Sequence, residues 1–176
     1  MALIVEDGSV VPGSESYLAV VDATAYHLNR GNAVWAALAT DTIREQCLRK
    51  ATDYMVQMYR SRWKGFRKDG TQLLDWPRSF VYLEPFVHGI VGTYPFLVSS
   101  TIVPLEVKNV CAELAVRVSV ADLAPDLDRQ AISKSVGPIR IDYDRSSQYY
   151  KQYRSLDALL APYLNGSSSS VKLMRT

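Results

Sequence analysis

Apolar residues recur every three or four positions in two long stretches of the chain, which predicts two amphipathic helices. The first helix should cover residues 41–60, with one apolar face formed by Ile43, Cys47, Ala51, Tyr54, Met55 and Met58. Thr42 and Glu45 have the spacing of a capping box at its start. The second should begin at Pro104, a residue suited to the first helical position, and end near Leu123. Val116 and Val120 widen its apolar stripe, so we expect it to lie centrally in a bundle or to touch a neighbouring subunit.

Shorter elements are predicted on both sides of these helices. Turn signals and local periodicity indicate helices over residues 21–28, 33–38 and 155–165, with Gly31 and Gly166 ending the first and the last. Strands are expected at residues 3–6 and, after the Gly137-Pro138 break, where apolar and polar residues alternate up to Tyr143.

These elements predict a mainly α fold, a small helical bundle with a short β-strand or hairpin element and extended N- and C-terminal arms. A chain of 176 residues suits one domain. We place this domain at residues 1–164, with a long loop insertion at 80–103 and a flexible tail at 165–176. Residues 85–105 contain no charged side chain, but their prolines and glycines argue against a membrane span and favour a loop with short β pieces, residues 96–98 among them.

Composition limits the possible partners. The chain has 20 basic and 18 acidic residues, a net charge of only +2, so any electrostatic surface for nucleic acid must be local. Cys47 and Cys111 occupy apolar helix positions, which predicts buried, reduced thiols. No basic residue precedes the short apolar run at the N-terminus, so no secretory signal is expected and the protein should stay where it is made.

Catalytic patterns are absent from the sequence. His27 and His88 lack the spacing of a zinc site, and no nucleophile motif is present. The sequence therefore predicts no catalytic residue, no metal, no cofactor and no enzymatic activity.

The most informative segment is the connector at residues 63–78, where Trp63, Phe66 and Trp76 stand among turn-forming glycines and a proline. Rings of this size must pack against the chain's own helices or against a partner. We assign Trp63, Phe66, Trp76 and Arg78 to packing within the bundle and to contact between subunits.

The same region alternates rings with positive charge, a combination that single-stranded nucleic acid needs for stacking and for phosphate contact. The candidate DNA contacts are Arg60, Arg62, Trp63, Lys64, Arg67 and Lys68. A second such region covers residues 140–154. Cations also favour helix ends, and tyrosine with arginine is typical of protein interfaces, so protein contact is the first interpretation and DNA contact the second.

The end of the chain carries four serines followed by alternating apolar and basic residues. One hypothesis is that this end is a docking peptide, formed by Val171, Lys172, Leu173, Met174 and Arg175. The alternative, which the sequence supports equally well, is a frayed terminus.

Several motifs resemble tailed-phage proteins labelled DnaT-like single-stranded DNA-binding proteins, which are similar in layout to head-tail connector adaptors. The motifs are L-I-V-E-D-G, S-Y-L-A-V-V-D-A-T-A-Y-H-L-N-R-G-N, A-T-D-Y, W-K-G-F-R to L-D-W-P-R, V-P-L-E-V-K-N-V-C-A-E-L-A and V-G-P-I. Residues 80–103 form a longer loop than the family pattern has.

This resemblance implies a structural virion protein, an adaptor that forms a dodecameric homo-oligomeric ring below the portal at the virion neck after assembly in the host cytoplasm. Its implied partners are the portal protein, a tail or stopper protein and double-stranded DNA passing through the lumen, with no membrane. In such an adaptor the C-terminal tail would dock onto the portal. The alternative is a single-stranded DNA-binding protein of phage replication.

Overall fold

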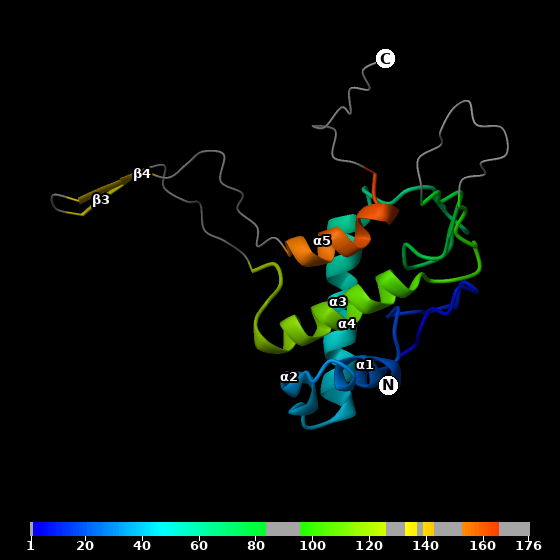
Figure 1. The fold of residues 1–176 in the computed structure, drawn as a ribbon, viewed down its shortest axis with the longest axis horizontal. Coiled ribbons are helices and arrows are strands. Elements are labelled where there is room, and N and C mark those ends of the chain that lie inside the picture. Colours follow the sequence, from blue (N-terminus) through cyan, green and yellow to red (C-terminus); the bar gives the residue numbers. More distant parts are fainter. Residues whose placement is uncertain (1, 84–95, 126–132, 137–138, 143–152, 166–176) are drawn as a thin grey trace, which may run out of the picture.

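The computed structural model describes residues 2–83, 96–125, 133–136, 139–142 and 153–165. Within them the helices are α1 (Val20–Leu28), α2 (Ala33–Ala36), α3 (Asp41–Tyr59), α4 (Leu105–Val120), α5 (Arg154–Leu160) and the short 3-10 helix η1 (Ala161–Tyr163) (Figure 1). Two antiparallel pairs are present, β1 (Phe66–Arg67) with β2 (Arg78–Ser79) and β3 (Ser133–Val136) with β4 (Ile139–Asp142). The predicted mainly α fold with a small hairpin element is confirmed.

The core forms where α3 crosses α4, because both helices have an apolar face. Leu48 and Met55 of α3 and Val107 and Leu114 of α4 belong to this core, and all four are almost fully buried. Helix α5, close to the C-terminal end of the sequence, also packs against α4. Cys47 and Cys111 are buried and free, as predicted, and burial raises the pKa of the Cys111 thiol.

Helix α3 begins at residue 41 as predicted, but its capping residue and the end of α4 differ from the predicted ones. Thr40, not Thr42, caps α3, and its Oγ1 accepts a hydrogen bond of 3.3 Å from the backbone N–H of Ile43. Thr40 has the extended backbone that a capping residue needs, whereas Thr42 already lies in the first turn. Pro104 directly precedes α4, which ends at Val120 rather than near Leu123.

The N-terminal segment is held by one buried carboxylate. Instead of the predicted strand at residues 3–6, Val5 makes a single parallel bridge with Ser16. Glu6, only 1% exposed, accepts backbone hydrogen bonds from Gly8, Val10 and Val11 at 2.9 to 3.0 Å. A Cβ at Gly8 would lie 2.1 Å from the carbonyl oxygen of Thr101, so this turn packs tightly against the residues that precede α4.

The remaining predicted features are the second strand, the long loop, the C-terminal tail and the second aromatic region. The strand expected up to Tyr143 is β4, which ends at Asp142 and pairs with β3, and this hairpin lies apart from the helices in Figure 1. Leu97, within the expected β piece, forms one antiparallel bridge with Tyr82. The tail at residues 166–176, the middle of the loop at 84–95 and most of the second aromatic region lie outside the described residues. No helix among the described residues is long and apolar enough to cross a membrane.

Candidate nucleic-acid interface

The two tryptophans of the connector are buried inside the chain's own core. Trp63 is 3% exposed and Trp76 is not exposed at all. The Trp63 and Trp76 ring centroids lie 5.6 Å apart in an edge-to-face arrangement, and Trp76 meets Tyr163 of η1 in the same way at 5.7 Å. The prediction that Trp63 contacts DNA is therefore wrong, because its ring has no free face. Trp76 and Arg78 are likewise buried within their own chain, as the predicted packing in the bundle requires, whereas the predicted contact between subunits stays a prediction.

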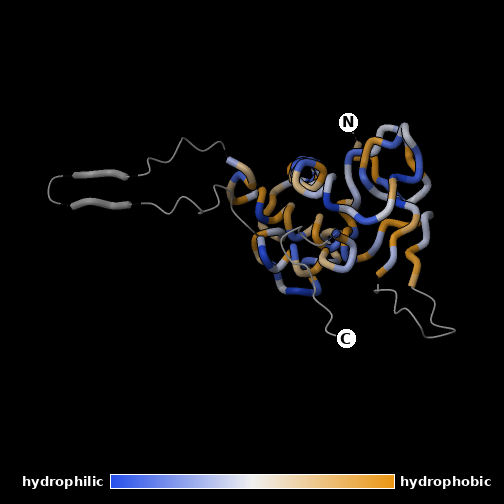
Figure 2. The backbone as a smooth tube through the Cα atoms, turned by 90° about the horizontal axis from the view of Figure 1, so that it is seen from above, coloured by the Kyte–Doolittle hydropathy of each residue, from blue (hydrophilic) through white to orange (hydrophobic). Residues whose placement is uncertain are grey.

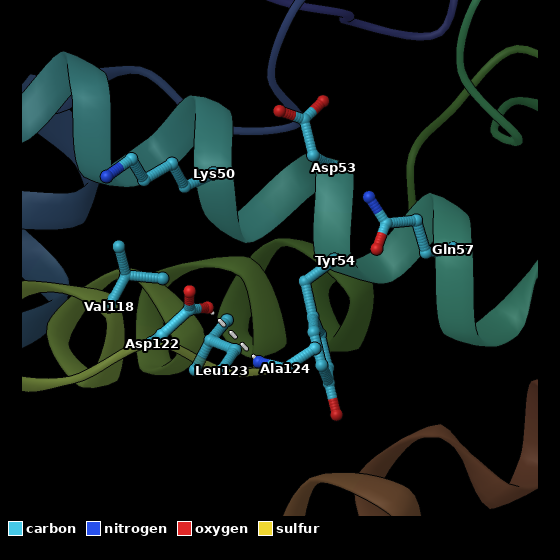
Figure 3. Close-up of a pocket in the computed structure, with 8 residues that line it drawn as sticks. All are labelled: Lys50, Asp53, Tyr54, Gln57, Val118, Asp122, Leu123 and Ala124. Atoms are coloured by element: carbon cyan, nitrogen blue, oxygen red, sulfur yellow. Dashed lines mark hydrogen bonds between the residues drawn. The ribbon is translucent and has the colours of Figure 1, made fainter. Parts of the chain in front are cut away.

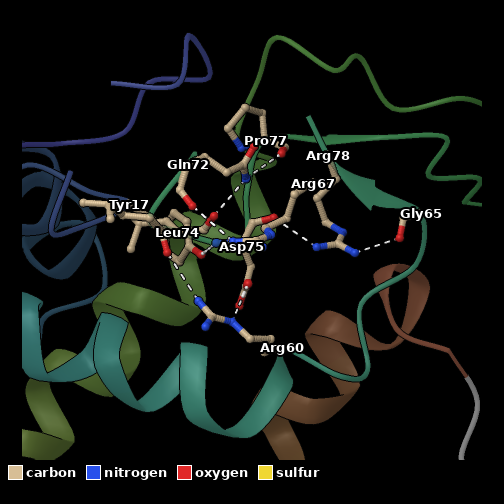
Figure 4. A network of polar contacts seen from close by, with 10 residues as sticks. Tyr17, Arg60, Gly65, Arg67, Gln72, Leu74, Asp75, Pro77 and Arg78 are labelled. Carbon is tan, nitrogen blue, oxygen red and sulfur yellow. Dashed lines mark hydrogen bonds and ion pairs between the residues drawn. The ribbon is translucent and has the colours of Figure 1, made fainter. Parts of the chain in front are cut away.

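A network of polar contacts fixes the shape of the connector (Figure 4). The Arg78 guanidinium donates hydrogen bonds to the carbonyl oxygens of Lys64 at 2.8 Å, Gly65 at 2.7 Å and Asp75 at 3.2 Å. Desolvation lowers the pKa of Arg78. Asp75 is 1% exposed, and its carboxylate forms an ion pair with Arg60 at 3.0 Å. The backbone N–H of Asp75 donates a hydrogen bond to the Tyr17 hydroxyl. The connector is thus tied to α3 and to the N-terminal segment.

Glycine at position 65 allows β1 to approach β2. Gly65 has a φ of +65°, and a Cβ there would lie 2.1 Å from the carbonyl oxygen of Ser79. The next residue, Phe66, pairs with Ser79 and leaves 72% of its side chain exposed. The same connector therefore buries Trp63 and Trp76 and exposes Phe66.

Other exposed rings lie on the neighbouring segments. The chain continues from β2 through Phe80 and Tyr82, which are 63% and 41% exposed, and the carbonyl oxygen of Val81 accepts a 2.9 Å hydrogen bond from Val98. Phe96, on that third segment, is 66% exposed. We call Phe66, Phe80, Tyr82 and Phe96 the aromatic face. Figure 2 shows hydrophobic positions in orange on the two segments that carry the last three.

Phe80 is held in an unfavourable backbone conformation. Its φ is +60°, which costs a bulky residue about 1–3 kcal/mol and persists only where neighbouring structure imposes it. Such strain at an exposed ring points to a use for that ring on the surface.

Three cations beside the aromatic face lack a carboxylate partner among the described residues. Lys64 donates to the carbonyl oxygens of Tyr82 and Pro162, Arg67 to that of Gln72, and Lys68 to that of Gly8. We call Lys64, Arg67 and Lys68 the basic triplet. The other predicted cations differ, since Arg60 is paired with Asp75 and Arg62 lies 3.5 Å from Asp157. Positive charge is therefore free where β1 exposes Phe66.

The hollow between α3 and the end of α4 is less suited to an anion. Its volume is about 390 Å³, and Figure 3 shows its lining residues, Lys50, Asp53, Tyr54, Gln57, Val118, Asp122, Leu123 and Ala124. Two carboxylates against one ammonium group give it a negative balance. Burial, followed by the charge of Glu15, raises the pKa of Asp53.

We searched the described residues for a metal site and for a histidine that could act as an acid or base. No cluster of three or more histidine, cysteine, aspartate or glutamate side chains among the described residues could hold a metal ion. His27 is buried, and its Nε2 lies 3.1 Å from the carbonyl oxygen of Ala112, to which it can only donate. Desolvation lowers the pKa of His27. His88 lies outside the described residues.

The described residues thus form a small helical domain with exposed rings beside cations that have no described carboxylate partner. A family model described as "Putative DnaT-like ssDNA binding protein" matches residues 1–176, so the chain belongs to this family. No curated protein and no solved structure matches the chain.

The family match overturns the expected head-tail connector adaptor. The matching family is described by single-stranded DNA binding, and no finding points to an adaptor. The expected partners, a dodecameric ring, a portal protein, a tail or stopper protein and double-stranded DNA in a lumen, are wrong for the same reason. The adaptor expectation came from a similarity in layout, which helical domains of different function can share. The second interpretation of the sequence, single-stranded DNA binding, fits the match better.

Proposed function

We propose that this protein binds single-stranded DNA through the aromatic face and the basic triplet. The observation that carries the proposal is that exposed rings on three adjacent segments lie beside cations with no carboxylate partner among the described residues. Family membership supports the ligand class.

The chemistry of the surface fits unpaired bases. Every base has a π-face, so stacking on Phe66 and Phe80 would tolerate any sequence and contribute about 1–3 kcal/mol per base. Lys64, Arg67 and Lys68 would follow the phosphates and displace their counterions. A duplex offers its phosphates but not its base faces, so the rings favour single strands. The proposed role is binding without turnover.

Trp63 supports this surface from below instead of touching DNA. Its packing against Trp76, together with the hydrogen bonds of Arg78, holds the backbone on both sides of Phe66 in place. A backbone held in this way has little further freedom to lose when a base stacks on Phe66.

Replacing Phe66 tests the proposal. Phe66→Ala should weaken binding of a fluorescent oligothymidylate about 5- to 150-fold, the equivalent of one lost stacking contact. Leu73→Ala is the matched control, because Leu73 belongs to the same connector and is also exposed, at 57%, but has no ring. Both variants should unfold at the wild-type urea concentration. Equal affinities for wild type and Phe66→Ala would refute the role of the aromatic face.

A further inference from the structure

A second hollow lies between α1 and the beginning of α4, separate from the aromatic face. Its volume is about 450 Å³, and it is lined by Leu18, Asp22, Tyr26, Asn29, Arg30, Leu105, Lys108 and Asn109. Two cations against one carboxylate give it a positive balance, the opposite of the hollow in Figure 3. Two asparagine amides add neutral hydrogen-bond donors.

Arg30 is held in position and still faces water. Its guanidinium lies 3.6 Å from the centroid of the Tyr26 ring and donates to the Tyr26 carbonyl oxygen at 3.2 Å. The Tyr26 hydroxyl in turn donates to Glu113 on α4 at 3.2 Å. Arg30 itself is exposed, so most of its donors remain available to a ligand. A guanidinium fixed by stacking suits recognition of a phosphate.

Lys108 provides the second cation. It lies one turn into α4, is half-buried, and makes no side-chain hydrogen bond or ion pair with any described residue. Its position near the N-terminal end of a 16-residue helix adds the positive end of the helix dipole to its own charge. The hollow therefore offers phosphate-binding groups from two different helices.

The N-terminal turn connects this hollow to the basic triplet. The Lys68 ammonium donates to the Gly8 carbonyl oxygen at 3.4 Å, and Gly8 packs against Thr101 and Ile102, shortly before α4 begins. A single strand leaving Lys68 would cross this turn and reach Lys108. Asp7, exposed on the turn, offsets part of the charge along this route.

We propose that the hollow between α1 and α4 binds the phosphate backbone of the same DNA strand after it leaves the aromatic face, with Arg30 and Lys108 as the phosphate contacts. This inference rests on the proposed function and adds a second contact region. It implies that long oligonucleotides gain affinity over short ones through these two side chains.

Oligothymidylates of increasing length, from about 4 to about 16 nucleotides, test the inference by fluorescence anisotropy at several salt concentrations. For the longest oligonucleotide, the double variant Arg30→Ala with Lys108→Ala should reduce the slope of log affinity against log salt by about 1.4, or about 0.7 per phosphate. The shortest oligonucleotide, which we expect to occupy the aromatic face alone, should bind the variant as it binds wild type. Lys50→Ala, in the hollow of Figure 3, should change neither value.

The outcomes separate this inference from the proposed function. If the wild type binds and the double variant keeps the full salt slope for the longest oligonucleotide, or loses affinity equally at every length, the second contact region is refuted and the aromatic face stands. If no length binds wild type, both fail. Lys108→Gln alone guards against misfolding, because this side chain makes no hydrogen bond or ion pair with a described residue and glutamine keeps most of its length, and its expected loss of slope is about 0.7.

Discussion

Trp63 and Phe66 show how neighbouring aromatic residues take opposite roles. They stand three positions apart in the sequence, yet Trp63 is 3% exposed and Phe66 is 72% exposed. Composition alone indicated that rings and cations meet here, but could not tell which ring faces water. That depends on the positive φ of Gly65 and on a π-contact with Trp76, a residue further along the chain.

Trp63→Ala should therefore act on stability. Removing a buried tryptophan side chain costs about 3–5 kcal/mol of unfolding free energy, and Trp63→Phe should cost less because the ring is kept. Urea unfolding followed by circular dichroism measures both. DNA affinity, corrected for the folded fraction, should stay within about twofold of wild type if Trp63 does not stack on bases. If Trp63→Ala kept full stability but lost DNA binding, Trp63 would be a surface residue that contacts DNA, contrary to this account.

At the scale of elements, periodicity located the long helices well. Helices α3 and α4 lie within one to three residues of their predicted bounds, because a repeat of three to four positions sustained over many residues fits a helix and not the period of two of a strand. Strands β1 and β2 are two residues long, too short for a period of two to be visible. Their pairing depends on contacts between residues more than ten positions apart, which local pattern does not contain.

The pairing of β1 with β2 predicts a sharp difference between two glycines of the connector. Gly65→Ala places a methyl group against the Ser79 carbonyl oxygen at a positive φ and should destabilise the fold by about 1–3 kcal/mol. Gly70→Ala is the matched control, since no atom lies within 4 Å of its added Cβ. Chemical unfolding of the two variants measures the difference. Similar midpoints for both would show that β1 does not pack on β2 as described.

At the scale of the whole molecule, the sequence could not separate apolar surface covered by the chain itself from surface covered by a partner. The wide stripe of α4 suggested a central position or a subunit contact; of the two valines that widen it, Val116 is half-buried against the core and Val120, the last residue of the helix, is largely exposed. The tryptophans of the connector were ambiguous in the same way. Apolar residues alone therefore left open whether a partner subunit covers them, and the expectation of a ring came from the resemblance to connector adaptors.

The ion pairs of the structure show which cations have no carboxylate partner among the described residues, and these indicate a binding surface that apolar residues alone did not. The net charge of +2 would suit many functions, but no described carboxylate pairs with the basic triplet, whose described hydrogen bonds go to carbonyl oxygens. Within the described part of the chain, positive charge without a carboxylate partner and exposed rings thus meet in one region, which is the distribution that a local binding surface requires.

The most direct test is the binding of the wild-type protein to a fluorescent single-stranded oligonucleotide, compared with its duplex, across a series of salt concentrations. We expect the single strand to bind more tightly than the duplex, with an affinity that falls as salt rises. Replacing all three cations of the basic triplet by alanine should reduce the salt slope by about 2, from about 0.7 per phosphate. Absence of single-strand binding at low salt, or a triple variant with the wild-type slope, would contradict the proposed function.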